Sequence, residues 1–129
     1  MKRLTAAFAA AITLVVVPVP AEAATARCVL NAERIQGVKM WLVRNNCTPA
    51  DPSDRIAQTI FWGADWPDLD DYLGAENYPT MNNRLEVSWA SLNEDALTGD
   101  EVYTENRFVR TNGSIYTVKS NEVKKEFLL

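Results

Sequence analysis

Hydrophobic and polar residues alternate along several short segments of this chain, and a period of two is typical of strands with one buried face. The cleanest case is Arg84–Trp89, where Leu85, Val87 and Trp89 fall on one side. Residues 56–62 also predict a strand, with its inner face assigned to Ile56, Ile60 and Trp62. Residues 63–79 hold two prolines and two glycines without a period, which predicts a long loop, with a short helix at Asp68–Leu73 as an alternative.

A first hairpin is predicted around Gly37, because glycine favours the first central position of a two-residue type II′ turn. With Gly37 and Val38 as the turn, counting outward places Cys28 opposite Cys47. The cysteine-bearing face is the predicted core face, and it carries Leu30, Ala32, Trp41 and Val43. A rival interpretation makes Leu30–Ile35 a helical turn.

The two cysteines predict one disulfide. Facing cysteines in a non-hydrogen-bonded strand pair are close enough to bridge. Closing a loop of this length contributes about 3 kcal/mol. Two free thiols or an intermolecular bridge are the alternatives.

A second hairpin is predicted over Val102–Val118, because Asn112-Gly113 between two β-prone runs suits a two-residue turn. In that register one side carries Val102, Phe108, Ile115 and Val123, and the other carries Tyr103, Val109, Tyr116 and Val118. Since both sides are partly apolar, the hairpin is either central or contains a bulge. The tail Val123–Leu129 is an edge strand or a frayed end.

Six or seven short strands separated by turn signals predict an all-β fold, a small antiparallel sandwich or partly open barrel with one disulfide. Residues 1–23 are predicted to be a signal peptide, because basic residues precede an apolar run, Ala6–Val17, that is too short to span a bilayer. A membrane anchor is the alternative reading of this segment. Cleavage is expected after Ala23, or alternatively after Ala26, which leaves residues 24–129 as a single secreted β domain, extracellular or periplasmic.

The charge balance limits the partners of the mature chain. Loss of two basic residues and one acidic residue with the signal peptide takes the 13 basic and 17 acidic residues to 11 and 16, a net charge of −5. An acidic domain without a basic run argues against binding to nucleic acid or anionic membranes. We expect a monomer that meets an extracellular protein or a carbohydrate, with no membrane span in the mature chain.

The absence of histidine removes several kinds of active site. Ser-His-Asp triads, Cys-His pairs and histidine-ligated zinc are excluded, and bridged cysteines supply no thiolate. The sequence has no phosphate-binding glycine loop. A pair of carboxylates, as in glycoside hydrolysis, is the remaining catalytic option.

Clusters of acidic residues in two loops suggest a cofactor, because Ca²⁺ takes six to eight oxygen ligands. The candidate metal ligands are Asp68, Asp70, Asp71, Asp95, Asp100 and Glu101. Like charges held together repel unless a cation lies between them, so the metal would act as a folding ligand. The alternative is that these acids are simply solvated.

The segment Glu94-Asp95 followed by Gly99-Asp100-Glu101-Val102-Tyr103 resembles a pattern in small secreted bacterial β-sandwich proteins of undefined function. This resemblance implies an exported, calcium-associated β-sandwich and no activity.

Four aromatic residues interleaved with acids form a candidate ligand-binding surface, since rings stack on apolar faces of sugars or peptides. They are Trp62, Trp66, Tyr72 and Tyr78. Alternatively the rings only cover the core.

The sequence therefore predicts a secreted, non-catalytic module that binds a ligand or protein partner and is stabilised by calcium. One alternative is a secreted protease inhibitor or small antagonist protein that presents Thr48–Arg55 or Gly63–Pro79. The other is a carboxylate-dependent hydrolase.

Overall fold

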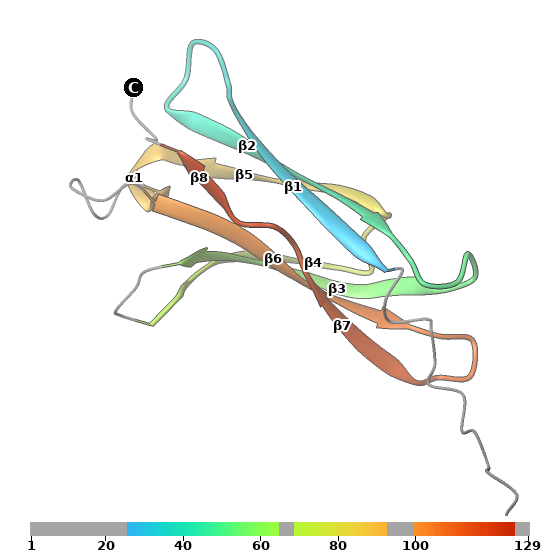
Figure 1. Cartoon of the computed structure of the whole chain (residues 1–129). Helices are drawn as coiled ribbons and strands as arrows, with labels where there is room; N and C mark the ends of the chain where they lie inside the picture. Colours follow the sequence, from blue (N-terminus) through green and yellow to red (C-terminus); the bar gives the residue numbers. More distant parts are fainter. Residues whose placement is uncertain (1–25, 65–68, 93–99, 126–129) are drawn as a thin grey trace, which may run out of the picture.

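The computed structural model of the chain describes residues 26–64, 69–92 and 100–125. They form two packed antiparallel sheets (Figure 1). The three-stranded sheet has the order β1 (Arg27–Arg34), β2 (Met40–Thr48) and β5 (Asn82–Ser88). The five-stranded sheet has the order β4 (Asp71–Asn77), β3 (Arg55–Ala64), β6 (Asp100–Val109) and β7 (Ile115–Lys119), and β8 (Val123–Lys125) also pairs with β6. The predicted antiparallel all-β fold is confirmed: of the two architectures expected, the sandwich is present, and the described residues form eight strands where six or seven were predicted.

The first hairpin has the predicted register and contains the predicted disulfide. Cys28 lies opposite Cys47, their Cα atoms are 4.0 Å apart, and their sulfurs are bonded. Cys47 donates its backbone N–H to Met81 O (2.8 Å), on the side away from β1, so the cysteines form a non-hydrogen-bonded pair. The predicted two-residue turn is wrong. The backbone bond from Ile35 N to Met40 O (3.0 Å) leaves a four-residue connection, in which Gly37 has φ +82°.

The alternative helical turn at Leu30–Ile35 is also wrong, because residues 30–34 belong to β1. The core face predicted for this hairpin is correct. Its four predicted residues are all buried: Leu30, Ala32, Trp41 and Val43.

The second hairpin exists, but its predicted register is wrong by one residue. Phe108 pairs with Tyr116, and the backbone bond from Arg110 N to Ser114 O (2.9 Å) closes a three-residue connection. Only Gly113 has a positive φ (+82°) in this connection, whereas a two-residue type I′ turn needs a positive φ at Asn112 as well. A slip of one residue moves every side chain of a strand to the other face. Tyr116 therefore faces inward, and Ile115 faces solvent.

A bulge in β3 changes the face predicted for its second half. Ile56 pairs with Phe108 and Gln58 pairs with Arg107, so Ala57 is an extra residue without a partner on β6. After this bulge Thr59 and Phe61 are buried, while Ile60 and Trp62 lie on the opposite face. The bulge is the physical reason that the alternation predicted for this strand fails.

The predicted loop at residues 63–79 is largely a strand, and the alternative helix at Asp68–Leu73 is wrong where it is described. Residues 71–77 form β4, which pairs with β3. No residue of β4 is fully buried, so the segment has no hydrophobic period to reveal it. In β5, Leu85 and Val87 point inward as predicted, whereas Trp89 begins the short helix α1 (Trp89–Leu92).

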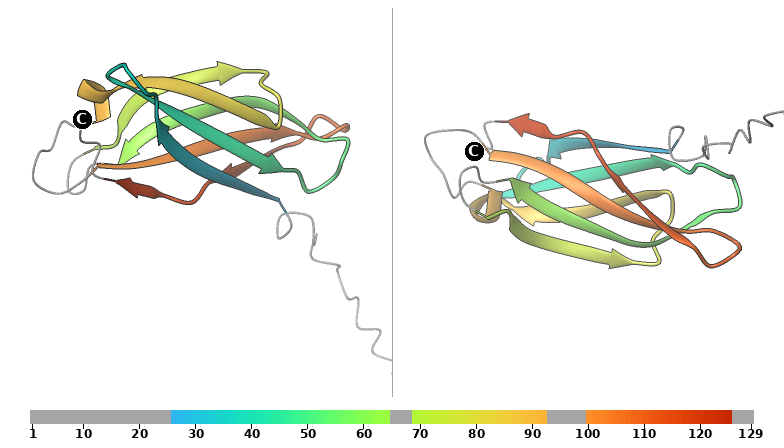
Figure 2. Two further views of the ribbon diagram at one scale, coloured as in Figure 1. Left: turned by 90° about the horizontal axis from the view of Figure 1, so that it is seen from above. Right: turned by 60° about the horizontal axis from the view of Figure 1, so that its bottom comes forward.

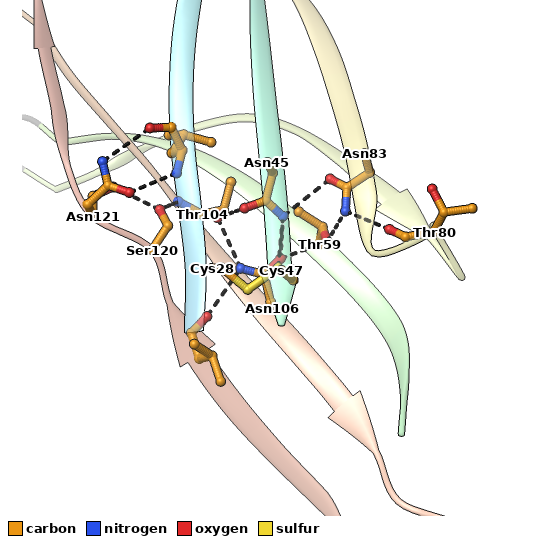
Figure 3. Close-up of a disulfide and its surroundings, with 12 residues drawn as sticks. Cys28, Asn45, Cys47, Thr59, Thr80, Asn83, Thr104, Asn106, Ser120 and Asn121 are labelled. Carbon is orange, nitrogen blue, oxygen red and sulfur yellow. Dashed lines mark hydrogen bonds between the residues drawn. A yellow bond between two sulfur atoms is a disulfide. The ribbon is translucent and has the colours of Figure 1, made fainter. Parts of the chain in front are cut away.

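A layer of amide and hydroxyl groups lies in the core (Figure 3). Buried apolar residues form two separate clusters, one on each side of this layer. Asn106 is its centre: its Oδ1 accepts bonds from Asn45 Nδ2 (2.8 Å) and Thr59 Oγ1 (2.8 Å), and its Nδ2 donates to Thr104 Oγ1 (3.0 Å). Asn83 Nδ2 extends the layer by donating to Thr59 Oγ1 (3.2 Å). These side chains come from both sheets, so the layer ties the sheets together by directional bonds.

One open side of the sandwich is closed by Asn121. Its Oδ1 accepts from Leu30 N (2.7 Å) and its Nδ2 donates to Leu30 O (3.1 Å), as a neighbouring strand would (Figure 3). The C-terminal segment between β7 and β8 thereby covers the edge of β1.

Candidate functional site

A groove of about 710 Å³ opens at the end of the sandwich that holds the disulfide. The β2–β3, β4–β5 and β6–β7 connections meet at this end, while α1 lies at the opposite end (Figure 2). The groove is lined by the start of β3, by the β4–β5 connection, by the end of β6 and by the start of β7. The lining residues are Arg55, Ile56, Ala57, Tyr78, Pro79, Thr80, Met81, Val109 and Ile115.

The wall formed by the β4–β5 connection holds Tyr78 in an unusual backbone conformation. Tyr78 has φ +49°, which no other non-glycine residue of the described part shares. Its N–H donates to the carbonyl of Ala57, the bulged residue of β3, at 2.9 Å. Bulky residues adopt such a conformation only where their surroundings enforce it, and such residues concentrate at ligand-binding sites. The bulge and this bond hold the Tyr78 ring in solvent, where it is 84% exposed.

The groove combines an apolar surface with one cation. Ile115 is 64% exposed, although its side chain is large and aliphatic. Ile56, below it, packs with the disulfide and Phe108 in the second core cluster, which makes this part of the groove rigid. Arg55 is the charged residue of the lining, and none of the carboxylates in the described part lies within ion-pair distance of it.

A buried carboxylate that the sequence analysis missed anchors the neighbouring β2–β3 connection. Asp54 is 3% exposed, and it accepts bonds from Asp51 N (3.2 Å) and Tyr116 Oη (2.7 Å). Tyr116 Oη in turn accepts a bond from Ala50 N (3.1 Å). Burial raises the pKa of Tyr116, the Ala50 bond opposes this, and the bond to Asp54 adds to it. The position of Asp54 directly before a strand could have singled it out in the sequence. Its partner Tyr116 could not be identified, because it is 62 residues away.

The four predicted aromatic ligand residues do not form one platform. Trp62 and Tyr72 are in edge-to-face contact, with ring centroids 5.9 Å apart. Tyr72 lies near the start of β4, whereas Tyr78 follows its end, so only Tyr78 lines the groove. Trp66 lies outside the described residues.

Several predicted calcium ligands lie near one end of the five-stranded sheet. Asp71 pairs with Gly63 in β3, and Glu101 pairs with the next residue, Ala64. Asp70 accepts a bond from Tyr103 Oη, and Glu101 forms an ion pair with Lys124 (3.2 Å). Asp100 begins β6, and Asp68 and Asp95 lie outside the described residues.

Within the described ranges, no three acids or cysteines form a group that could hold a metal ion. Calcium binding stays a prediction.

Comparison with protein-family models and with curated proteins gives no match. No helix in the part of the chain that the structure describes is long and apolar enough to cross a membrane. The disulfide is typical of an oxidising compartment.

Proposed function

We propose that this chain is a secreted, non-catalytic β-sandwich module that binds a small amphipathic acid in the groove beside Tyr78. The observation that carries the proposal is the combination of an exposed aliphatic and aromatic lining with an unpaired arginine, Arg55. The volume of about 710 Å³ lies in the range of small-molecule sites.

Charge complementarity favours an acid as the ligand. Arg55 is a cation at an apolar surface, and a carboxylate placed there forms a charge-assisted hydrogen bond. The exposed Ile115 side chain gains most from covering by an apolar ligand, since each buried CH₂ contributes about 0.8 kcal/mol. The ligand would therefore place its acid group at Arg55 and its apolar body along Ile115 and Tyr78.

The lining favours binding over catalysis. It contains no carboxylate, histidine or thiol, so it offers no general base or nucleophile to a bound molecule. Thr80 supplies a hydroxyl, but that group donates to Asn82 O (2.7 Å).

Fluorescence titration with a dansylated long-chain carboxylic acid tests the proposal. Arg55→Gln is expected to weaken binding about tenfold, the effect of losing one hydrogen bond to a charged group. Ile115→Asn is expected to weaken binding by a similar factor. Arg107→Gln and Val29→Asn are matched controls, because they change an exposed arginine and an exposed β-branched residue elsewhere.

Two results would overturn the proposal. One is equal affinity in the Arg55 and Ile115 variants and their controls. The other is equal affinity for the corresponding long-chain alcohol, which would remove the acid from the ligand class.

A further inference from the structure

The outer face of the three-stranded sheet carries rows of polar side chains, which no strand or helix formed by the described residues covers. The register aligns Asn31 with Arg44 and Arg84 in one row. The adjacent row contains Asn46 and Asn82. All five of these residues are exposed, so the face presents two guanidinium groups beside three amides.

The two arginines on this face are directly opposite each other across the β2–β5 pair. Like charges in this position destabilise a sheet. Arg44 is drawn toward β1 by Glu33, with its Nε and Nη2 at 2.9 and 2.8 Å from Glu33 Oε1. Among the described residues, no carboxylate lies within ion-pair distance of Arg84, although Glu86 is on the same face of β5. Arg84 therefore has its full set of donors available.

A shallow pocket lies between these side chains. It has a volume of about 230 Å³ and is lined by Arg44, Asn46, Asn82, Asn83 and Arg84. Its floor is rigid, because the Asn83 side chain donates to Thr59 Oγ1 in the buried polar layer and to Thr80 O (3.1 Å). The pocket has a rigid floor, is polar and cationic, and is large enough for a single sugar unit.

We propose that this pocket binds a sugar that carries an oxyanion, such as a uronic acid or a sulfated hexose. Arg84 binds the oxyanion through paired N–H donors, which match the geometry of a carboxylate or sulfate. The amide side chains of Asn46 and Asn82 donate to and accept from the ring hydroxyls. The bound anion also reduces the repulsion between Arg84 and Arg44.

This site is separate from the groove beside Tyr78. The two sets of lining residues share no member, and one contains strands of the three-stranded sheet whereas the other contains strands of the five-stranded sheet. The sequence has a net charge of −4, so general electrostatic attraction does not account for an anion here. Binding depends instead on local donors.

Titration of ¹⁵N-labelled protein with glucuronate and glucose 6-sulfate, followed by NMR at constant ionic strength, tests the proposal. Glucose and acetate are the comparison ligands, because each carries only half of the required chemistry. We expect the two acidic sugars to shift the side-chain amide signals of Asn46 and Asn82. Arg84→Gln should weaken their binding about tenfold, whereas Arg107→Gln, on the other sheet, should leave it unchanged.

The outcomes separate the sources of the anion and the role of the sugar. Preference for glucuronate over the sulfate ester, or the reverse, identifies which oxyanion the pocket accepts, and either supports the proposal. Binding of acetate as tight as that of glucuronate overturns the role of the ring hydroxyls. Equal weakening by Arg84→Gln and Arg107→Gln, or no binding of either acidic sugar, overturns the site.

Discussion

Replacing Asn106 by leucine tests whether the buried polar layer holds the two sheets together. Asn106 is 0% exposed, and its Oδ1 accepts bonds from Asn45 Nδ2 and Thr59 Oγ1, each at 2.8 Å. Leucine has a similar size, so the substitution removes the amide without opening a large cavity. What changes is that two buried donors lose their best acceptor.

The magnitude follows from the cost of unsatisfied buried groups, about 1–3 kcal/mol each. Asn45 Nδ2 keeps a longer contact with Asn83 Oδ1 (3.4 Å), which limits its loss. The Thr59 hydroxyl still accepts from Asn83. Part of the cost is offset by the apolar surface that leucine buries. We expect the free energy of unfolding to fall by about 3 kcal/mol, and Tm to fall by roughly 12 to 24 °C for a domain of this size.

Urea unfolding followed by tryptophan fluorescence measures this change, with the buried Trp41 as a reporter. Asn31→Leu is the matched control, because Asn31 is an exposed asparagine on β1, and we expect a change below about 0.5 kcal/mol. Further substitution of Asn45 by leucine should cost less than the first change, since the donor left unpaired is removed with it. An Asn106→Leu variant as stable as the parent chain would refute the structural role of the layer.

Two further predictions concern pH and calcium. Burial is the main cause that raises the pKa of Tyr103, and the hydrogen bond to Asp70 raises it further. In the unfolded chain the phenol has a pKa near 10, so as pH rises it loses its proton there before it does in the folded protein. The free energy of unfolding should therefore fall as pH rises above about 10, and Tyr103→Phe should reduce that fall in thermal melts across this range. If Ca²⁺ is bound, a free Ca²⁺ concentration of a hundred times Kd should stabilise the domain by about 2.7 kcal/mol. A Tm that is unchanged when a chelator is added would show that Ca²⁺ does not stabilise the domain.

The layer that these experiments address was partly visible in the sequence. Asn45 alternates with Val43 and Cys47 on the face predicted to be the core, and Asn83 has the same phase as Leu85. An inward polar residue on one strand predicts a buried partner, since buried polar groups are hydrogen-bonded. It does not name that partner, because the bond from Asn45 to Asn106 spans 61 residues and depends on how the sheets pack.

Alternation, turn-forming residues and the two cysteines determined by themselves that this chain is an all-β sandwich or partly open barrel, that Cys28 faces Cys47, and that Leu85 and Val87 point inward. These features depend on period and on local chain geometry, which the sequence expresses directly.

Tertiary structure alone decided the register of the second hairpin, the bulge at Ala57 and the existence of β4. A three-residue connection and a two-residue connection give strand registers that differ by one residue, and packing of Tyr116 on Phe108 favours the former.

Both proposed binding sites also depend on long-range packing. Residues lining the groove beside Tyr78 come from three strands and the β4–β5 connection. The arginine pair exists because β5 lies next to β2 in one sheet, although β3 and β4, which come between them in the sequence, belong to the other sheet. The order of the strands in the sheets determines which residues meet at a surface. That order depends on burial across the whole domain rather than on neighbours in the chain.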